Sequence, residues 1–202
     1  MERKIVLLNG SPRAPKSNSR RYAVIFREHC PVAADYFEIT RRNHAMLCSK
    51  TDEYTDVVLV FPLYADSLPV SLLDFLKSLE AARSERRRPT VSVMINCGFL
   101  EYEQNMVAVD MVRLFCRRNG YPFGSVLMIG GGEAILDTPF RLLAGRRIAA
   151  FARAVAEGRA QSMHVTMPIT KRMFLWASDI YWRMYGRRHG VSKRQMESMR
   201  IE

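Results

Sequence analysis

The alternation of short apolar runs with segments of helical periodicity constrains the fold of this chain more than any other feature. Five runs resemble strands, and they are residues 4–9, 35–39, 55–62, 90–96 and 125–130. Three of these runs are nearly continuous in apolar side chains instead of alternating with polar ones. Such strands are typical of a parallel sheet that helices cover on both faces. The sequence therefore predicts an α/β fold.

Four amphipathic segments lie among these runs and are expected to be helices. They are residues 19–30, 69–80, 102–118 and 138–157. Pro69 and Pro139 suit the first helical turn, and Gly158 suits a helix end. Helical spacing within the third segment predicts that four apolar side chains face the core, namely Met106, Val107, Leu114 and Phe115. The helix after the second strand is expected to be shortened or lost. Right-handed crossovers then favour a doubly wound sheet that binds ligands at the carboxyl ends of its strands.

The last part of the chain differs in composition. Residues 159–202 contain nine Lys or Arg and three acidic residues, so they supply +6 of the net charge of +11. Helical spacing aligns an apolar stripe of Met173, Trp176, Ala177, Ile180, Tyr181 and Met184. We therefore expect a domain over residues 1–158 and a basic, aromatic-rich helical extension over residues 159–202.

Several classes of protein are disfavoured by composition. No signal peptide is recognisable, and the apolar runs fall short of the ~20 residues that span a bilayer. The four cysteines form no C-x-x-C pair, so reduced thiols and a cytoplasmic location are expected. His44 and Cys48 have helical i, i+4 spacing but no evident further ligands, so no metal site is expected. The positive net charge favours anionic ligands.

The loop after the first strand, "NGSPRAPKSNS", resembles a nucleotide-triphosphate loop but lacks its second glycine. Pro15 stands there, and it has no N–H group to wrap around a β-phosphate. The loop is instead rich in hydroxyl, amide and basic groups followed by a helix start, which suits one terminal phosphate monoester. The candidate phosphate ligands are Ser11, Arg13, Ser17, Asn18 and Ser19, and Lys16 would neutralise charge nearby. An ordinary capped turn remains the alternative interpretation.

Two further loops follow the third and fourth strands. The first contains Pro62, Leu63 and Tyr64, whose ring suits a flat aromatic ligand. The second spans residues 96–99, where Gly98 permits a close backbone approach. A phosphate at one loop and a planar ring between the other two fit flavin mononucleotide (FMN). Cys97 as a nucleophile is a weaker alternative, because no His or Asp partner is evident.

These residues together resemble a known family. The segments "LLNGSPR", "SNS", "PLYADSLPVSLLDFL", "NCGFLEYEQN" and "IGGG", in this order, are similar to the flavodoxin-like NAD(P)H-dependent FMN reductases over residues 3–157. The resemblance implies a five-stranded parallel sheet of order 2-1-3-4-5 with FMN bound non-covalently. The phosphate would lie on Ser11, Arg13, Ser17, Asn18 and Ser19. The ring would lie between Pro62, Leu63 and Tyr64 on one side and Asn96, Cys97, Gly98 and Phe99 on the other. Many relatives carry a cysteine-rich insert before the third strand, whereas this chain has only Cys48 there, so no iron–sulfur cluster is expected.

The function expected from this resemblance is an NAD(P)H oxidoreductase that passes electrons through FMN to a small acceptor such as a quinone or a flavin. The flavin carries the chemistry, so no catalytic side chain is expected. A homo-oligomer, in the form of a homodimer, is expected as well. One alternative is a flavodoxin-type electron carrier, although such carriers dock through acidic surfaces and this chain is basic. Another is a membrane-surface or nucleic-acid module built on the basic extension, whose apolar stripe otherwise packs on the domain or on a second subunit.

Overall fold

The computed structural model describes residues 3–14, 16–82 and 88–198. The chain divides into two compact units, Met1–Met167 and Pro168–Glu202. The first unit holds a layered sheet, and the second holds two helices.

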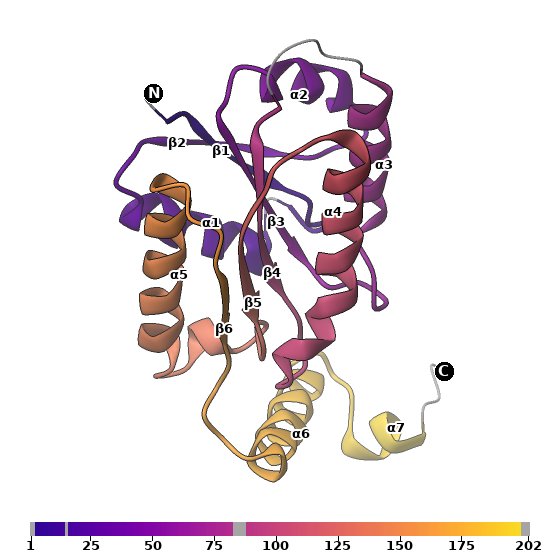
Figure 1. Ribbon diagram of the computed structural model, residues 1–202. Helices are drawn as coiled ribbons and strands as arrows, with labels where there is room; N and C mark the ends of the chain where they lie inside the picture. The colour runs from indigo at the N-terminus through magenta and orange to yellow at the C-terminus, as the bar shows by residue number, and fades with distance from the viewer. Residues whose placement is uncertain (1–2, 15, 83–87, 199–202) are drawn as a thin grey trace. The chain divides into compact units, whose positions relative to one another are not determined.

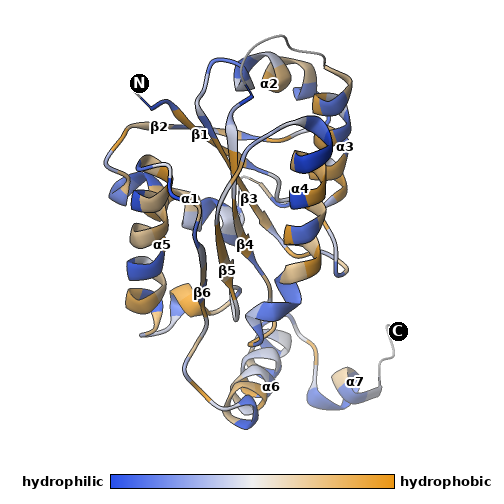
Figure 2. Cartoon of the chain, viewed as in Figure 1, coloured by the Kyte–Doolittle hydropathy of each residue, from blue (hydrophilic) through white to orange (hydrophobic). Residues whose placement is uncertain are grey.

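The first unit is built on six parallel strands in the order β2-β1-β3-β4-β5-β6. The five strands predicted from sequence are β1 (Ile5–Asn9), β2 (Ala34–Glu38), β3 (Asp56–Pro62), β4 (Thr90–Asn96) and β5 (Phe123–Ile129). Every side chain of β1 is buried, and so are the first six of β3. Figure 2 shows hydrophobic residues along β3, β4 and β5. Such strands are expected where helices cover both faces of a sheet, as the continuous apolar runs predicted.

The sixth strand corrects the prediction of five. β6 (Ser162–Val165) pairs with β5 from Val126↔Ser162 to Ile129↔Val165. It lies at the sheet edge, and its short sequence SMHV leaves Ser162 and His164 exposed, so it has no continuous apolar run to reveal it. Residues 159–167, which the sequence analysis assigned to the extension, thus fall within the sheet unit.

Helices cover both faces of the sheet (Figure 1). One face carries α1 (Asn18–His29) and α5 (Arg141–Ala156), and the other carries α2 (His44–Thr51), α3 (Val70–Ala81) and α4 (Met106–Asn119). The helix expected to be shortened or lost is α2, with eight residues. Two 3-10 turns, η1 (Tyr102–Asn105) and η2 (Ile135–Asp137), precede α4 and α5.

The prediction of which α4 side chains face the core is wrong. Met106, Val107 and Leu114 are exposed, and the buried side chains are Ala108, Val109, Val112 and Cys116. The segment has two apolar arcs, and the arc of smaller side chains lies against the sheet, where it permits a closer approach. Phe115 is partly buried and packs at the margin of the core.

On the other face, α1 and α5 are joined through aromatic packing. Phe26 and Phe151 are fully buried and meet edge to face with ring centroids 5.8 Å apart. This contact fixes the position of α1, whose first turn borders the candidate site described below.

Replacing Phe151 by alanine should therefore destabilise the sheet unit by about 3–5 kcal/mol, because the truncation leaves a cavity between α1 and α5. Urea denaturation followed by circular dichroism measures the change. Leu142→Ala is the matched control: Leu142 lies in the same helix but is 69% exposed, and its loss should change the free energy of unfolding by less than about 0.5 kcal/mol. Equal effects of the two substitutions would contradict this account of the packing.

Candidate functional site

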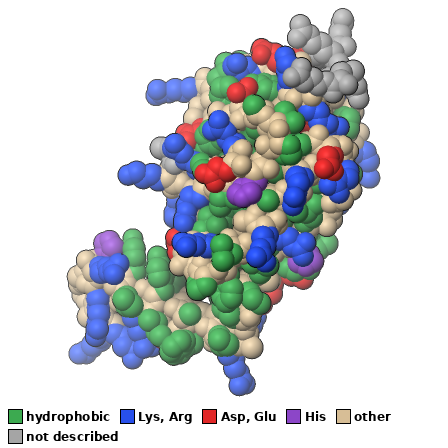
Figure 3. Space-filling model, turned by 90° about the vertical axis from the view of Figure 1, so that its left-hand side faces the viewer, with side chains coloured by type: hydrophobic (Ala, Val, Ile, Leu, Met, Phe, Trp, Pro, Cys, Tyr) green, Lys and Arg blue, Asp and Glu red, His purple; other side chains and the backbone are tan. Residues whose placement is uncertain are grey.

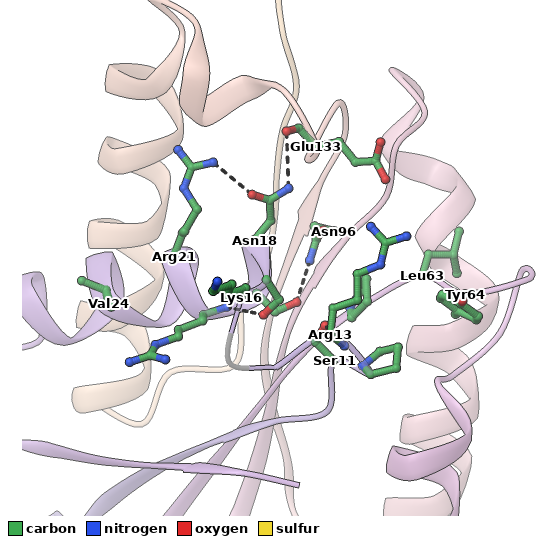
Figure 4. A pocket seen from close by; sticks show the side chains of 15 residues that line it. Ser11, Arg13, Lys16, Asn18, Arg21, Val24, Leu63, Tyr64, Asn96 and Glu133 are labelled. Atoms are coloured by element: carbon green, nitrogen blue, oxygen red, sulfur yellow. Dashed lines mark hydrogen bonds between the residues drawn. The ribbon is translucent and has the colours of Figure 1, made fainter. Parts of the chain in front are cut away.

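A cavity of about 570 Å³ opens where the carboxyl ends of β1, β3 and β4 meet the first turns of α1 (Figure 4). Nine of the residues predicted for the site line it: Ser11, Arg13, Ser17, Asn18, Ser19, Pro62, Leu63, Tyr64 and Asn96. The remaining lining residues are Pro12, Lys16, Arg20, Arg21, Val24 and Glu133. Residues that are far apart in the sequence thus converge on one hollow, as expected at the switch point of a doubly wound sheet.

A buried side chain fixes the conformation of the first loop. Asn9, the last residue of β1, is fully buried, and its Oδ1 accepts a hydrogen bond of 2.9 Å from the Ser11 N–H. Its Nδ2 donates to the Tyr36 hydroxyl at 2.9 Å and to Ser17 Oγ at 3.4 Å. One amide therefore ties the start of the loop to its end and to the neighbouring strand. Pro15, on which the prediction against a nucleotide-triphosphate loop depends, lies outside the described residues.

The first turn of α1 presents N–H groups to the cavity. Ser17 is the N-cap residue, and its Oγ accepts a hydrogen bond of 3.2 Å from the Arg20 N–H. Helix geometry leaves the N–H groups of Asn18 and Ser19 without a carbonyl acceptor inside the helix. The helix dipole adds partial positive charge at the same place. This end of the cavity suits an anion with several oxygen atoms.

Basic side chains surround this helix start. Arg13, Lys16, Arg20 and Arg21 all line the cavity and are exposed. Arg21 forms two hydrogen bonds with Asp137, at 2.6 and 2.9 Å, and these lower the pKa of the Asp137 carboxyl. The site thus combines a cluster of positive charge with a helix N-terminus.

Asn18 is held in place by two contacts. Arg21 donates to its Oδ1 at 3.0 Å, and its Nδ2 donates to the Glu133 carbonyl at 3.3 Å. The second contact joins the first turn of α1 to the loop after β5 (Figure 4). The sequence analysis missed Glu133, Arg20 and Arg21. The two arginines could have been found, because they lie within one helical turn of the cap, whereas only the fold brings Glu133 there.

The Ser19 side chain also makes a contact within the protein. It is buried, and its Oγ accepts a hydrogen bond of 3.2 Å from Asn96 Nδ2. Asn96 Nδ2 also contacts the Phe61 carbonyl at 3.2 Å. The Ser19 hydroxyl therefore links α1 to the end of β4, and the N–H group of Ser19 is the part that suits an anion.

The second loop forms one wall of the cavity. The Leu63 N–H donates to the Asn96 carbonyl at 2.7 Å, which fixes this loop against β4. Tyr64 and Ser67 pair through two backbone hydrogen bonds across a tight turn, with Ala65 and Asp66 at positive φ. Tyr64 lines the cavity and is 54% exposed, so it is accessible to a ligand.

The third loop contributes less than predicted. Asn96 lines the cavity, whereas Cys97, Gly98 and Phe99 do not. Cys97 is buried, and its Sγ accepts a hydrogen bond of 3.3 Å from Asn105 Nδ2. Gly98 and Phe99 are exposed beside it. The side chain of Glu133 lies over this loop, with its Cδ 3.6 Å from where a Cβ on Gly98 would be.

Backbone hydrogen bonds hold the loop after β5 against this third loop. The Gly132 N–H donates to the Cys97 carbonyl at 2.7 Å, and the Gly131 N–H donates to the Phe99 carbonyl at 2.5 Å. The buried hydroxyl of Tyr22 donates to the Gly132 carbonyl at 2.6 Å, which connects the same loop to α1. The edge of the cavity is therefore a connected set of loops.

The part of the chain that the structure describes offers neither a cluster of metal-binding side chains nor a helix suited to span a membrane. No group of three or more His, Cys, Asp or Glu side chains there could hold a metal ion. None of the helices combines the length and the apolar character needed to cross a bilayer.

Comparison with known proteins shows the fold. No protein-family model and no curated protein sequence matches this chain. Among solved structures, a flavodoxin from Streptococcus pneumonia has a TM-score of 0.57 and 18% identity, covering 76% of this chain and 98% of its own. An NAD(P)H:quinone oxidoreductase from Methanothermobacter marburgensis has a TM-score of 0.57 and 15% identity, and the match covers 76% of this chain and 96% of the oxidoreductase chain. An FMN-dependent NADH-azoreductase from Bacillus anthracis, solved in complex with FMN, has a TM-score of 0.54 and 15% identity, covering 74% and 97%. The predicted flavodoxin-like fold is confirmed, with six strands in place of five.

The environment of Cys97 predicts that it is chemically inert. Burial raises the pKa of its thiol, so at neutral pH the group is protonated and is a poor nucleophile. Brief treatment of the native protein with iodoacetamide at pH 8, followed by peptide mass spectrometry, should leave Cys97 unmodified. The half-buried Cys30 serves as an internal comparison, and urea-unfolded protein shows that all four cysteines can react. Rapid native labelling of Cys97 would instead support its alternative role as a nucleophile.

Proposed function

We propose that the cavity binds FMN and that the chain is an NAD(P)H-dependent oxidoreductase. The observation that supports this most strongly is the first turn of α1. Two N–H groups without helical acceptors open there into a cavity that is also lined by four basic side chains. Such an arrangement suits a doubly charged phosphate monoester without a metal ion.

The residues of the phosphate end match the chemistry of that group. The N–H groups of Asn18 and Ser19 and the hydroxyls of Ser11 and Ser17 would donate to phosphate oxygens. Arg13 would balance the charge from the cavity wall. Because Asn9 already holds Ser11 and Ser17, the loop needs little rearrangement to bind its ligand.

The ring end of the proposed site is formed by the second and third loops. Pro62, Leu63 and Tyr64 offer an apolar and aromatic wall to the cavity. Gly98 and Phe99 are exposed in the third loop, next to Asn96, which also lines the cavity. The Cys97 N–H is already donated to the Ile129 carbonyl at 3.0 Å. Backbone donation to the ring is therefore assigned to Gly98 and Phe99.

When bound, FMN supplies the redox chemistry, accepting a hydride equivalent from a reduced nicotinamide and passing electrons to an acceptor. The side chains described above bind and orient it, and none of them is assigned a covalent role. The named activities of the azoreductase and the quinone oxidoreductase suggest small aromatic acceptors for this chain as well. A homodimer in the cytoplasm completes the proposal.

The second candidate function is that of an electron carrier, since a flavodoxin is equally similar in fold. The net charge of +11 argues against it, because a flavodoxin-type carrier docks through an acidic surface.

If the cavity binds the phosphate, its affinity for FMN should be much higher than its affinity for riboflavin, which lacks the phosphate. FMN should bind at least about tenfold more tightly, because each charge-assisted hydrogen bond contributes about 1.5–3 kcal/mol. Arg13→Gln should weaken FMN binding by about fivefold and leave riboflavin binding unchanged. Quenching of flavin fluorescence measures both affinities. Arg118→Gln, an exposed arginine at the end of α4, is the control of equal charge. Equal affinities for the two flavins would rule out the phosphate site.

Turnover separates the reductase from the carrier. The FMN-loaded protein should oxidise NADH or NADPH in the presence of a quinone, at a rate well above that of free FMN. Loss of the nicotinamide absorbance measures the rate, and protein without FMN is the control. A protein that binds FMN but does not accelerate this oxidation would fit the electron carrier instead.

A further inference from the structure

The second compact unit carries a helix whose large apolar side chains are left exposed by the described residues of the same unit. α6 (Lys171–Arg188) begins at the N-cap Thr170, whose Oγ1 accepts a hydrogen bond of 3.3 Å from the Met173 N–H. Gly186 is the one buried residue among its 18. Eight large apolar side chains of α6 are between 37% and 69% exposed: Met173, Leu175, Trp176, Ile180, Tyr181, Trp182, Met184 and Tyr185.

The unit has little core of its own to cover this surface. The short helix α7 (Lys193–Ser198) packs beside Gly186, where an added Cβ would lie 2.6 Å from Met196 Sδ. The Val191 N–H donates to the Gly186 carbonyl at 2.9 Å and so turns the chain at this point. Among the described residues of the unit, α7 therefore packs on the side of α6 around Gly186.

The exposed side chains are organised along the helix. Met173, Ile180 and Met184 follow the i, i+7, i+11 spacing of one helical face. Beside this face lies an aromatic cluster, in which the rings of Tyr181 and Trp182 are 5.3 Å apart and those of Trp182 and Tyr185 are 5.7 Å apart. The lowest part of Figure 3, at the height of α6 and α7 in Figure 1, shows hydrophobic side chains together with Lys and Arg side chains on one surface.

The charge of this unit is strongly positive. Residues 168–202 contain eight Lys or Arg and three Asp or Glu, a net charge of +5. Two of the acids are within ion-pair distance of basic residues on their own helices, Asp179 of Arg183 at 2.7 Å and Glu197 of Lys193 at 3.4 Å. The unit thus combines exposed aliphatic and aromatic groups with an excess of cations.

We propose that α6 binds flat on the surface of a membrane that contains anionic lipids. Aliphatic side chains such as Met173 and Ile180 gain free energy when they enter hydrocarbon, Trp and Tyr suit the lipid–water interface, and Lys and Arg attract lipid phosphates. Because no described helix can cross a bilayer, the helix lies in the interface. This inference does not depend on the flavin site.

The same features disfavour two other occupants. A second copy of this unit would bring two charges of +5 together, which opposes pairing. Nucleic acid would satisfy the cations and could stack on the aromatic rings, but it offers no apolar environment to Met173, Ile180 and Met184. Anionic lipid matches the charge and the apolar surface together.

The chain contains its own probe for a test. Both of its tryptophans, Trp176 and Trp182, lie in α6, so intrinsic tryptophan fluorescence reports on this helix alone. Titrating the full-length protein with phosphatidylcholine vesicles containing a quarter phosphatidylglycerol should shift the emission to shorter wavelength and protect it from acrylamide. Pure phosphatidylcholine vesicles should bind much more weakly, and salt should weaken the binding to anionic vesicles.

Matched variants locate the contact. Arg187→Gln with Arg188→Gln should lower the partition coefficient on anionic vesicles roughly 25-fold, at about fivefold per lost charge. Arg117→Gln with Arg118→Gln removes the same charge from exposed positions on α4. This control should leave the partition coefficient on anionic vesicles unchanged. Met173→Ser with Met184→Ser should weaken binding without changing the charge. Circular dichroism and FMN affinity should stay as in the parent chain.

Three results would overturn the proposal. The first is an unchanged emission spectrum with anionic vesicles at low ionic strength. The second is tryptophan protection that rises with protein concentration in step with a dimer mass, without lipid, which would assign α6 to a second copy. The third is binding of a single-stranded oligonucleotide that is tighter than vesicle binding and is lost with the Arg187 and Arg188 substitutions, which would assign it to nucleic acid.

Discussion

The candidate site depends on one constraint, the way in which the buried Asn9 amide sets the loop between β1 and α1. With its carbonyl on the Ser11 N–H and its amino group on Tyr36 and Ser17, this side chain holds both ends of the loop. Ser17 can then cap α1, and the next two N–H groups point away from the helix carbonyls. A buried amide with its hydrogen bonds satisfied is rigid, so it holds the loop in one shape.

The rest of the cavity edge is tied to this loop by a few polar contacts. Asn96 joins β4 to α1 through Ser19, and Tyr22 joins α1 to the loop after β5. The packing of Phe26 against Phe151 holds the helix from the other side. Strand-end loops from four strands thereby keep fixed positions around one cavity, which is what a cofactor with a charged end and a flat end requires.

Much of the site was predictable because its parts are local. The hydroxyl-rich loop, the N-cap at Ser17 and the turn at Tyr64 are each encoded within a few residues, and the parallel sheet brings their ends together. The contacts that Ser19 and Cys97 make within the protein were not predictable. Both look like ligands in the sequence, but Ser19 is bonded to Asn96 and Cys97 points toward Asn105. Glu133 and the edge strand β6 gave no local signal, since a carboxylate after glycines and the peptide SMHV fit many settings.

The sequence alone determined the α/β alternation, because five apolar runs and the helices among them follow from side-chain periodicity. It also determined the chemistry of the first loop and the basic, aromatic character of the last helix. Only the tertiary structure decided which polar groups face the cavity, which arc of α4 lies on the sheet, and that β6 extends the sheet. Periodicity records that a segment has an apolar side, but the partner that covers that side is chosen by packing between residues distant in the chain.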